Sequence, residues 1–592
     1  MSTSQLRDGI APAPVTGSIP VMERQRPPSR AVFTRWLLVL PLIVIIGLAV
    51  LWPMGSILLR SFTPEGTASF SDGFTFEHYA SIFADDVLRN VTWGTLKLGV
   101  YSTVGTVIFT FPVAYLLSRL KARTAGVLLL VLLLPFWVSI LVRLFSYTTI
   151  LGRNGIINGI IKFFGGDGVE LLFNTPAVVI GMIAYLSPYM LLILYAGMTG
   201  IDQSLVTVAK TMGASGMQIF RRIIMPLIMP SLISGSLLVF VLALGFFLTP
   251  AILGGPKNMT IPVYIEQQIG IYQWGSASAT GIVLAVVSLI GYAIAMRIAG
   301  TSIFIPSAGA GSKGSTQAEP LPKNATTAVS WIFTVALMAF MILPLLVVVP
   351  TAFGDTSQVQ FPPKGFTLDW FSEVLTSPTW TDAISKSFVV GLSVAILSPL
   401  MALGVARVIQ QTRRPWVKSL LMVVSFAPLV IPVILLAIGN FDVQNGLRMT
   451  GSTIGLIPLH VIISYPLALL VITNALNRQD RALEEAAWSM GISRIRTFWT
   501  IVVPSIVPAL MAAAVLSFVT SWDEAVLSYF QTGSYPTLPV QIFSLIKSGV
   551  TPAVPAISVL LMLPVVIVTL VLIIRQLPRK SKKLQNPAEA AQ

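Results

Sequence analysis

Long apolar segments constrain this chain more than any other feature of its sequence. Twelve segments approach the roughly 20 residues that an α-helix needs to cross the ~30 Å hydrocarbon core of a bilayer. Of the 592 residues, 55% are hydrophobic and only 10% are charged, which is outside the usage of soluble globular proteins. The pattern therefore predicts an all-α protein that is embedded in a membrane.

The apolar segments form two sets of six. The first set lies near residues 36–58, 92–117, 124–145, 175–198, 224–248 and 277–298. The second set lies near residues 329–349, 387–409, 417–437, 454–472, 502–526 and 555–574. Because six is an even number, both sets enter the membrane in the same orientation. A pseudo-two-fold axis along the membrane normal is therefore expected, rather than the in-plane axis of inverted repeats.

A spaced motif occurs once in each set. Every residue of the motif recurs at one constant offset along the chain: Gly213, Phe220, Ile223, Pro226 and Pro230 become Gly491, Phe498, Ile501, Pro504 and Pro508. Both copies lie in polar, basic stretches between apolar segments. We therefore expect two exposed loops beside the membrane, each of which docks a partner.

Nearer the start of each set the repeat has a longer offset. Residues 73–75 (Gly-Phe-Thr) recur as residues 365–367, farther along the chain than the offset of the motif would place them. Because the offset is shorter at the motif, a short stretch of the first set must be absent from the second set. We place this deletion in the loop after the third span, where residues 151–174 correspond to the shorter segment 439–453.

The charge of the chain is distributed by loop. The formal net charge is +15, and Lys and Arg cluster before the first span and in alternate loops after it. Cytoplasmic loops carry an excess of Lys and Arg, so these loops and both termini are predicted to face the cytosol. The positive charge thus indicates topology, and no nucleic-acid partner is predicted. With no cysteine and two histidines, no metal site is predicted either.

Composition divides the chain into five parts. The segment between the two sets is rich in Gly, Ser and Ala, which is typical of a flexible tether. The predicted parts are a disordered cytosolic tail (1–34), a first membrane domain (35–299), a cytosolic linker (300–327), a second membrane domain (328–577) and a cytosolic tail (578–592).

The second copy of the motif begins with Glu485-Ala-Ala-Trp-Ser-Met-Gly491. Asp480 is placed to cap a short helix, Ala486 and Ala487 leave room for a partner surface, and Gly491 permits the turn that ends the helix. This segment strongly resembles the cytoplasmic loop signature of permease subunits of bacterial ATP-binding-cassette (ABC) importers. The resemblance covers nearly the whole chain when both copies are counted.

The resemblance implies two tandem six-helix permease domains of the type I ABC importer fold. In that family the short helix inserts into a groove on a dimer of cytosolic ATPase subunits. Those subunits bind ATP and Mg²⁺, so this chain is expected to hold no cofactor. The implied ATPase-coupling residues are Thr207, Val208, Ala209 and Gly213 in the first copy and Glu485, Ala486, Ala487 and Gly491 in the second. The first copy departs from the family pattern, because Thr207 replaces the acid.

Further segments resemble one subfamily. Residues 134–158, which include Leu134-Pro-Phe-Trp137, are similar to the first permease of spermidine/putrescine-type importers. Residues 517–524 (Ser-Phe-Val-Thr-Ser-Trp-Asp-Glu) and 538–540 (Leu-Pro-Val) are similar to the second permease of the same pair. The chain therefore resembles both permeases joined in one polypeptide. The implied cargo is a polyamine or related amine, and an organophosphonate, an opine-like solute or ferric ion are the alternatives.

Two adjacent acids, Asp523 and Glu524, lie near the outer end of an apolar span. Acids within spans are costly and usually face a bundle interior, so one hypothesis is that they line the translocation path and attract a cation. Trp522 and Tyr529 would add cation–π surface to that path. The alternative is a pair of acids at the membrane interface. Arg143 is expected outside the membrane, where it would meet an anionic cargo or the delivering protein.

Three classes of function compete. The leading hypothesis is a permease of the bacterial inner membrane that receives a small solute from an extracytoplasmic binding protein, with lipid around it and ATPase subunits below it. An ion-coupled secondary carrier would favour inverted repeats and acids in the middle of spans, and neither occurs in the sequence. A membrane-bound enzyme would have only His78 and His460 as histidines and no cysteine to use.

Overall fold

The structure of the chain is a computed structural model that describes residues 29–576, except for residues 65, 68, 70, 72, 154, 300–324, 357–358, 534 and 550. The described part consists of helices, with one isolated β-bridge between Gly354 and Phe366. We refer to residues 29–299 as the first half and to residues 325–576 as the second half. The predicted linker and both chain ends lie largely outside the described residues.

The helices of the first half are α1 (Ser29–Ile46), η1 (Gly47–Leu51), α2 (Trp52–Arg60), α3 (Glu77–Ala84), α4 (Asp86–Leu117), α5 (Ala122–Leu133), η3 (Leu134–Trp137), α6 (Ile140–Leu151), α7 (Ile156–Phe163), α8 (Thr175–Thr199), α9 (Gln203–Thr211), α10 (Gly216–Ile219), η4 (Phe220–Ile224), α11 (Met225–Leu244), η5 (Pro250–Gly254), η6 (Pro256–Asn258), α12 (Ile261–Gly270) and α13 (Trp274–Ala299). The helices of the second half are α14 (Ala325–Thr351), α15 (Asp369–Thr376), α16 (Pro378–Gln411), α17 (Pro415–Val430), α18 (Val433–Gly446), α19 (Thr453–Arg478), α20 (Arg481–Ser489), α21 (Arg494–Thr497), η9 (Phe498–Val502), α22 (Val503–Trp522), α23 (Val526–Gln531), α24 (Leu538–Ser548) and α25 (Ala553–Gln576).

The predicted spans correspond to ten helices and two bent helix pairs. Among the described residues, ten helices are long and apolar enough to cross a bilayer. The two other predicted spans, 124–145 and 417–437, are not straight. The chain turns by 89° between the helices at 122–137 and 140–163, and by 94° between α17 and α18. The third predicted span of each half is therefore a bent pair of helices rather than one straight helix.

Proline and burial explain the two breaks. Pro432 stands between α17 and α18, where it supplies no N–H to continue the helix, and Pro135 lies in the short η3 before α6. An interrupted backbone at membrane depth is tolerated where protein covers it. Leu141 and Leu435, on the two helices that follow the breaks, are both fully buried.

The two halves repeat each other element by element. Helices α9, α10, η4 and α11 recur in the same order as α20, α21, η9 and α22, and the long helix α4 recurs as α16. Helix α7 has no counterpart, because the second half passes directly from α18 to α19, and the short η6 has none either. The predicted deletion is therefore confirmed, and α7 is the element that it removes.

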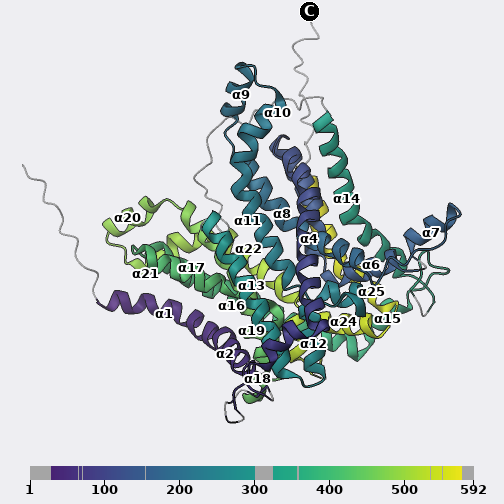
Figure 1. Cartoon of the computed structure of the whole chain (residues 1–592). Coiled ribbons are helices and arrows are strands. Elements are labelled where there is room, and N and C mark those ends of the chain that lie inside the picture. Colours follow the sequence, from purple (N-terminus) through teal and green to yellow (C-terminus); the bar gives the residue numbers. More distant parts are fainter. Residues whose placement is uncertain are drawn as a thin grey trace, which may run out of the picture.

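The first helix of each half packs against helices of the other half. Helix α1 packs against α16 and α2 packs against α18, while α14 packs reciprocally against α4 and α6. Figure 1 shows that the two sets of helices meet near α12, α18 and α24 and diverge toward α9–α10 at the top and α20–α21 at the left. The halves thus form the parallel pseudo-two-fold pair of type I permease domains that the resemblance implied.

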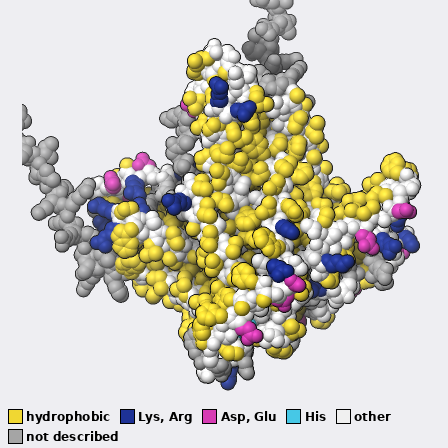
Figure 2. Space-filling model, in the orientation of Figure 1, with side chains coloured by type: hydrophobic (Ala, Val, Ile, Leu, Met, Phe, Trp, Pro, Cys, Tyr) yellow, Lys and Arg dark blue, Asp and Glu magenta, His cyan; other side chains and the backbone are white. Residues whose placement is uncertain are grey.

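The outer faces of the long helices are apolar. Ile332, Val335 and Leu346 on α14 are 60–66% exposed, as residues that contact lipid would be. Figure 2 shows apolar side chains over the sides of α4, α11 and α14, with basic side chains gathered over α9–α10 and α20–α21. This distribution is that of a multi-pass membrane protein.

Two predicted boundaries differ from the structure. Helix α1 begins at Ser29, so residues 29–34, which were predicted to belong to a disordered tail, are helical. Helix α14 begins at Ala325, within the predicted linker. The reason is that apolar composition marks only the lipid-facing part of a helix, whereas backbone hydrogen bonds continue into polar residues.

Gly439 provides a test of the interlocked packing. A Cβ at Gly439 on α18 would lie 2.7 Å from the Cβ of Pro53 on α2 and 2.9 Å from its carbonyl oxygen. We expect Gly439→Leu to separate α2 from α18 and destabilise the protein by about 1–3 kcal/mol, because overpacked contacts cannot relax. Thermal unfolding in detergent measures the effect. Gly446→Leu is the matched control, since nothing lies within 4 Å of a Cβ there, and equal melting temperatures for the two variants would contradict the packing.

Candidate functional site

The two repeated loops begin with the same cap. Asp202 precedes α9 and accepts a hydrogen bond from the backbone N–H of Ser204 at 2.9 Å, which holds the pKa of Asp202 below its usual range. Asp480 precedes α20 and accepts from the N–H of Ala482 at the same distance. A carboxylate at this position satisfies a backbone donor that the helix leaves free. The predicted capping role of Asp480 is therefore confirmed.

The two loops also end with the same turn. Gly213 and Gly491 have φ angles of +82° and +83°, in the left-handed region that side chains other than glycine rarely adopt. The N–H of Gly213 donates to the carbonyl of Lys210, and the N–H of Gly491 donates to the carbonyl of Trp488, each at 3.0 Å. Both glycines thus end a two-turn helix and send the chain toward the next span.

The predicted coupling residues lie mostly on an open surface. In the described structure Thr207, Val208 and Gly213 are exposed on the first loop, and Ala209 is half-buried. On the second loop Glu485, Ala486 and Gly491 are exposed. Ala487 is only 1% exposed, so it packs inward and does not leave room for a partner as the sequence suggested.

The inward faces of the two loops differ. Glu484 on α20 is 4% exposed and forms a bidentate ion pair with Arg407 on α16. The residue that corresponds to Glu484 in the first loop is Val206, which is 3% exposed. This ion pair was not among the predicted site residues. The signal was available, because Arg407 is a charged residue within a predicted span.

The acids after α22 are half-buried and bind helix ends. Both oxygens of Asp523 accept from the N–H of Ile140, at 3.1 and 3.2 Å, so this carboxylate caps α6 of the other half. Glu524 accepts from the N–H of Leu527 at 2.7 Å and caps α23. Helix N-termini carry partial positive charge, which stabilises the two acids where they lie.

Aromatic rings and one cation surround the Asp523 carboxylate. Arg143 on α6 is 5% exposed and lies 5.8 Å from the ring centre of Tyr185, and its charge attracts that of Asp523. Tyr185 hydrogen-bonds to Tyr189, whose ring packs against Phe136. The expectation that Arg143 would be open to an external partner was wrong, because the bend before α6 turns this residue into the protein.

The two aromatic residues predicted near these acids have separate contacts. The ring of Trp522 stacks on Phe518, with centroids 5.5 Å apart. The hydroxyl of Tyr529 donates to Glu266 of the first half at 3.1 Å. Lys547 also binds Glu266, at 2.9 Å, and its Nζ atom lies 5.9 Å from the ring centre of Tyr529. The ring of Tyr529 therefore already has a cation–π contact within the chain.

Polar bonds between the halves gather at the end where the helix sets meet. Arg60 on α2 pairs with Asp442 on α18 at 2.8 Å, and Asn440 donates to the carbonyl of Ala49 at 2.9 Å. The contacts of Asp523 and Glu266 described above also join the halves. His460 lies within the second half, where it bonds Ser521 and Ser528. No group of three or more His, Cys, Asp or Glu side chains that could hold a metal occurs in the described residues.

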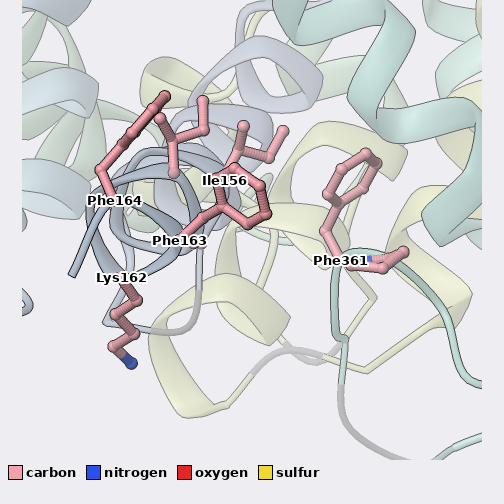
Figure 3. A pocket seen from close by; sticks show the side chains of 9 residues that line it. Ile156, Lys162, Phe163, Phe164 and Phe361 are labelled. Atoms are coloured by element: carbon pink, nitrogen blue, oxygen red, sulfur yellow. The ribbon is translucent and has the colours of Figure 1, made fainter.

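Helix α7 carries an apolar groove at the edge of the first half. A cavity of about 590 Å³ lies between α7 and the segment at Phe361 and Pro362 of the second half. Figure 3 shows Phe163 pointing toward Phe361 across this groove, while Lys162 points away from it. Phe163 and Phe164 are 85% and 81% exposed, so α7 presents an apolar surface with no counterpart in the second half.

The fold and the paired loops define the class of the protein, which is the permease of an ABC importer, a transport subunit rather than an enzyme. Residues 32–302 and 402–582 match the family "Binding-protein-dependent transport system inner membrane component". These residues make up more than half of the chain, so the chain belongs to this family. It is a multi-pass inner-membrane protein of a transport system that uses a binding protein.

Two relatives with spermidine/putrescine permease names match the chain. It is 32% identical to the spermidine/putrescine transport system permease protein PotB of Salmonella typhimurium over 253 residues, which cover 42% of this chain and 88% of PotB. PotC of Escherichia coli is 28% identical over 265 residues, which cover 43% of this chain and 96% of PotC. Similarity to both PotB and PotC confirms the resemblance to a joined pair of permeases.

Other similar proteins have different cargoes in their names. The ferric transport system permease protein FbpB of Actinobacillus pleuropneumoniae is 25% identical over 477 residues, which cover 76% of this chain and 66% of FbpB. The crystal structure of a bacterial alginate ABC transporter in complex with an alginate pentasaccharide-bound periplasmic protein aligns with a TM-score of 0.39 and 21% identity, over 46% of this chain and 96% of that chain.

Proposed function

We propose that this chain supplies both permease domains of an ATP-driven importer, in which two ATPase subunits dock on α9 and α20 and the cargo is a polyamine or related amine. The observation that carries the proposal is the pair of capped, glycine-ended helices at the diverging ends of the two halves. Each exposes a small surface on a rigid two-turn helix, which suits insertion into a groove of a partner subunit.

The chemistry of the second loop favours tighter docking than that of the first. Glu485 offers an exposed carboxylate, which forms stronger hydrogen bonds with a basic partner than a hydroxyl does. The first loop has Thr207 at the same position. We infer that ATP and Mg²⁺ are held by the partner subunits, and that the two loops contribute unequally to binding them.

The basic loops support an orientation in which α9, α20, both termini and the linker face the cytosol. Arg221 and Arg222 follow α9, and Arg494 and Arg496 follow α20. An excess of Lys and Arg is typical of the cytoplasmic side. The end where the halves meet, which carries Asp442 and Glu266, then faces the binding protein.

The charge balance around Asp523 supports a cationic cargo. Two carboxylates, Asp523 and Glu524, lie beside one guanidinium, that of Arg143, so these three groups carry a net negative charge when ionised. Tyr185 and Tyr189 are close enough to Asp523 to interact with it electrostatically, and ammonium groups bind to aromatic rings. We propose that a protonated amine passes this junction, exchanging contacts with Asp523 while Trp522 and Tyr529 line the wall nearby.

The alternative cargoes differ in charge. Ferric ion is the cargo in the name of FbpB, and it shares with polyamines the positive charge that the two carboxylates favour. An organophosphonate or an opine-like solute would instead depend on Arg143. Uptake of labelled spermidine, ferric ion and a phosphonate into vesicles with the complete transport system separates these candidates, and uptake of the phosphonate alone would contradict a cation path.

Substitution of the turn glycines tests the docking loops. We expect Gly491→Glu to abolish uptake and stimulated ATP hydrolysis, because a side chain at φ +83° distorts the end of α20. Gly213→Glu should also be harmful, and Glu485→Ala should reduce uptake more than Thr207→Ala. Uptake and ATPase assays on the reconstituted complex give the answer. Wild-type activity of an assembled Gly491→Glu variant would remove α20 from the ATPase interface.

Cysteine labelling tests the orientation. The chain contains no cysteine, so Ser312→Cys places a single thiol in the predicted linker, which lies outside the described residues. We expect a membrane-impermeant maleimide to label it in inverted vesicles and not in intact cells. Lys257→Cys, in the short helix η6 before α12, is the control for the opposite side. Labelling of position 312 in intact cells would show that the linker faces the outside and that the predicted orientation is wrong.

Replacement of Asp523 by Asn tests the cation path. Asn keeps an oxygen that accepts from Ile140, so the cap of α6 remains while the charge is lost. We expect kcat/KM for uptake of an amine to fall about tenfold, which corresponds to ~1.4 kcal/mol of lost attraction. Glu524→Gln, which keeps the cap of α23, is the parallel variant. Unchanged uptake kinetics in a correctly assembled Asp523→Asn variant would leave Asp523 with a capping role alone.

A further inference from the structure

A buried ion pair joins α20 to the membrane core of the second half. Arg407 lies near the end of α16, and its Nη1 atom donates to Oε1 of Glu484 at 2.9 Å while Nη2 donates to Oε2. Arg407 is 9% exposed and Glu484 is 4% exposed. Two parallel bonds between planar groups fix distance and orientation together, which a single contact does not.

Neighbouring polar groups extend this pair into a network. Arg407 also donates to the side chain of Gln410, and the Nε2 atom of Gln410 donates to the carbonyl of Leu476 at the end of α19. Arg481, the first residue of α20, donates to the backbone carbonyl of Gln410 at 3.2 Å. Helices α16, α19 and α20 are thus held together by directional bonds at one point.

At the two positions of this ion pair the first half has uncharged residues. The residues that correspond to Glu484 and Arg407 by the offsets of the repeat are Val206 and Tyr115. Val206 is buried in the apolar core, and Tyr115 and Phe111 contact the ring of Phe220 edge-on, with centroids 6.4 and 6.3 Å away. Apolar contacts of this kind depend on buried area and have little directional preference.

We propose that Arg407 is a positioning residue for the coupling helix α20, and that its bond to Glu484 makes α20 move as one body with α16. Val206 and Tyr115 cannot form such an ion pair in the first half. The proposal rests on the proposed function, in which α9 and α20 bind the ATPase subunits. Movement of the ATPase would then reach the second half as a displacement of α16 through this ion pair. The two loops would share a docking role and differ in how they transmit motion.

The pair is distinguishable from an ordinary stabilising contact. If it only stabilised the fold, replacing both charges by apolar side chains of similar size would restore function, because such replacements of buried pairs are often neutral for stability. If it positions α20, the same replacement would restore stability and leave transport poorly coupled to ATP hydrolysis. The informative quantity is therefore the number of solute molecules imported per ATP, measured beside the melting temperature.

The test uses the complete transport complex in proteoliposomes with its binding protein. The variants are Arg407→Met, Glu484→Gln and the double variant Arg407→Met/Glu484→Leu. The double variant has uncharged side chains at both positions, as the first half has. We expect the double variant to assemble and to melt near the wild-type temperature, with uptake per ATP reduced about tenfold. Val206→Ala is the matched control in the first loop, where we expect less than a twofold change in that ratio.

Two outcomes would overturn the proposal. One is wild-type uptake per ATP in the assembled double variant, which would make the pair a stabilising contact only. The other is an equal loss of coupling in Val206→Ala. A cysteine placed at Ala486 and cross-linked to the ATPase in the wild-type background keeps the proposed function separate, because absence of that cross-link would count against docking itself. If the single variants fail to fold, the double variant still decides the question.

Discussion

The need to satisfy every backbone hydrogen bond away from water governs this structure. In a bilayer a helix meets that need within itself, which is why the long segments are unbroken wherever lipid surrounds them. The chain departs from this rule after α5 and after α17, and both departures lie where the halves cover them. At the first departure Asp523 provides an acceptor for the free N–H of Ile140.

The two junctions solve the same problem in different ways. In the pseudo-symmetric position to Asp523 stands Gly245, which packs so closely on Pro432 that a Cβ would lie 3.1 Å from the proline Cβ. Proline has no N–H and requires no acceptor, so glycine is sufficient there. An acid is needed opposite Ile140, which has a free N–H, and is not needed opposite Pro432, which has none. The negative charge that we connect with cargo is therefore also a consequence of helix capping.

Much of the fold could be predicted from the sequence, because it depends on patterns that repeat along the chain. The spans follow from apolar length, and the loops from the spacing of Gly213 and Gly491 with their prolines. The bends could not be predicted in this way, since a buried segment such as α6 is as apolar as a lipid-facing one. Partners across the halves, such as Arg60 with Asp442, and partners between distant helices of one half, such as Arg407 with Glu484, require knowledge of which helices meet.

The two halves differ at the surface where α7 lies, because only the first half has this helix. Where an element occurs in both halves, a partner bound across the pseudo-axis could turn by half a revolution and meet a similar surface. Beside α7 it cannot, since the second half joins α18 to α19 without an insertion. The exposed rings of Phe163 and Phe164 thus make this surface asymmetric, and a single-chain partner that contacts it can bind in one orientation rather than two.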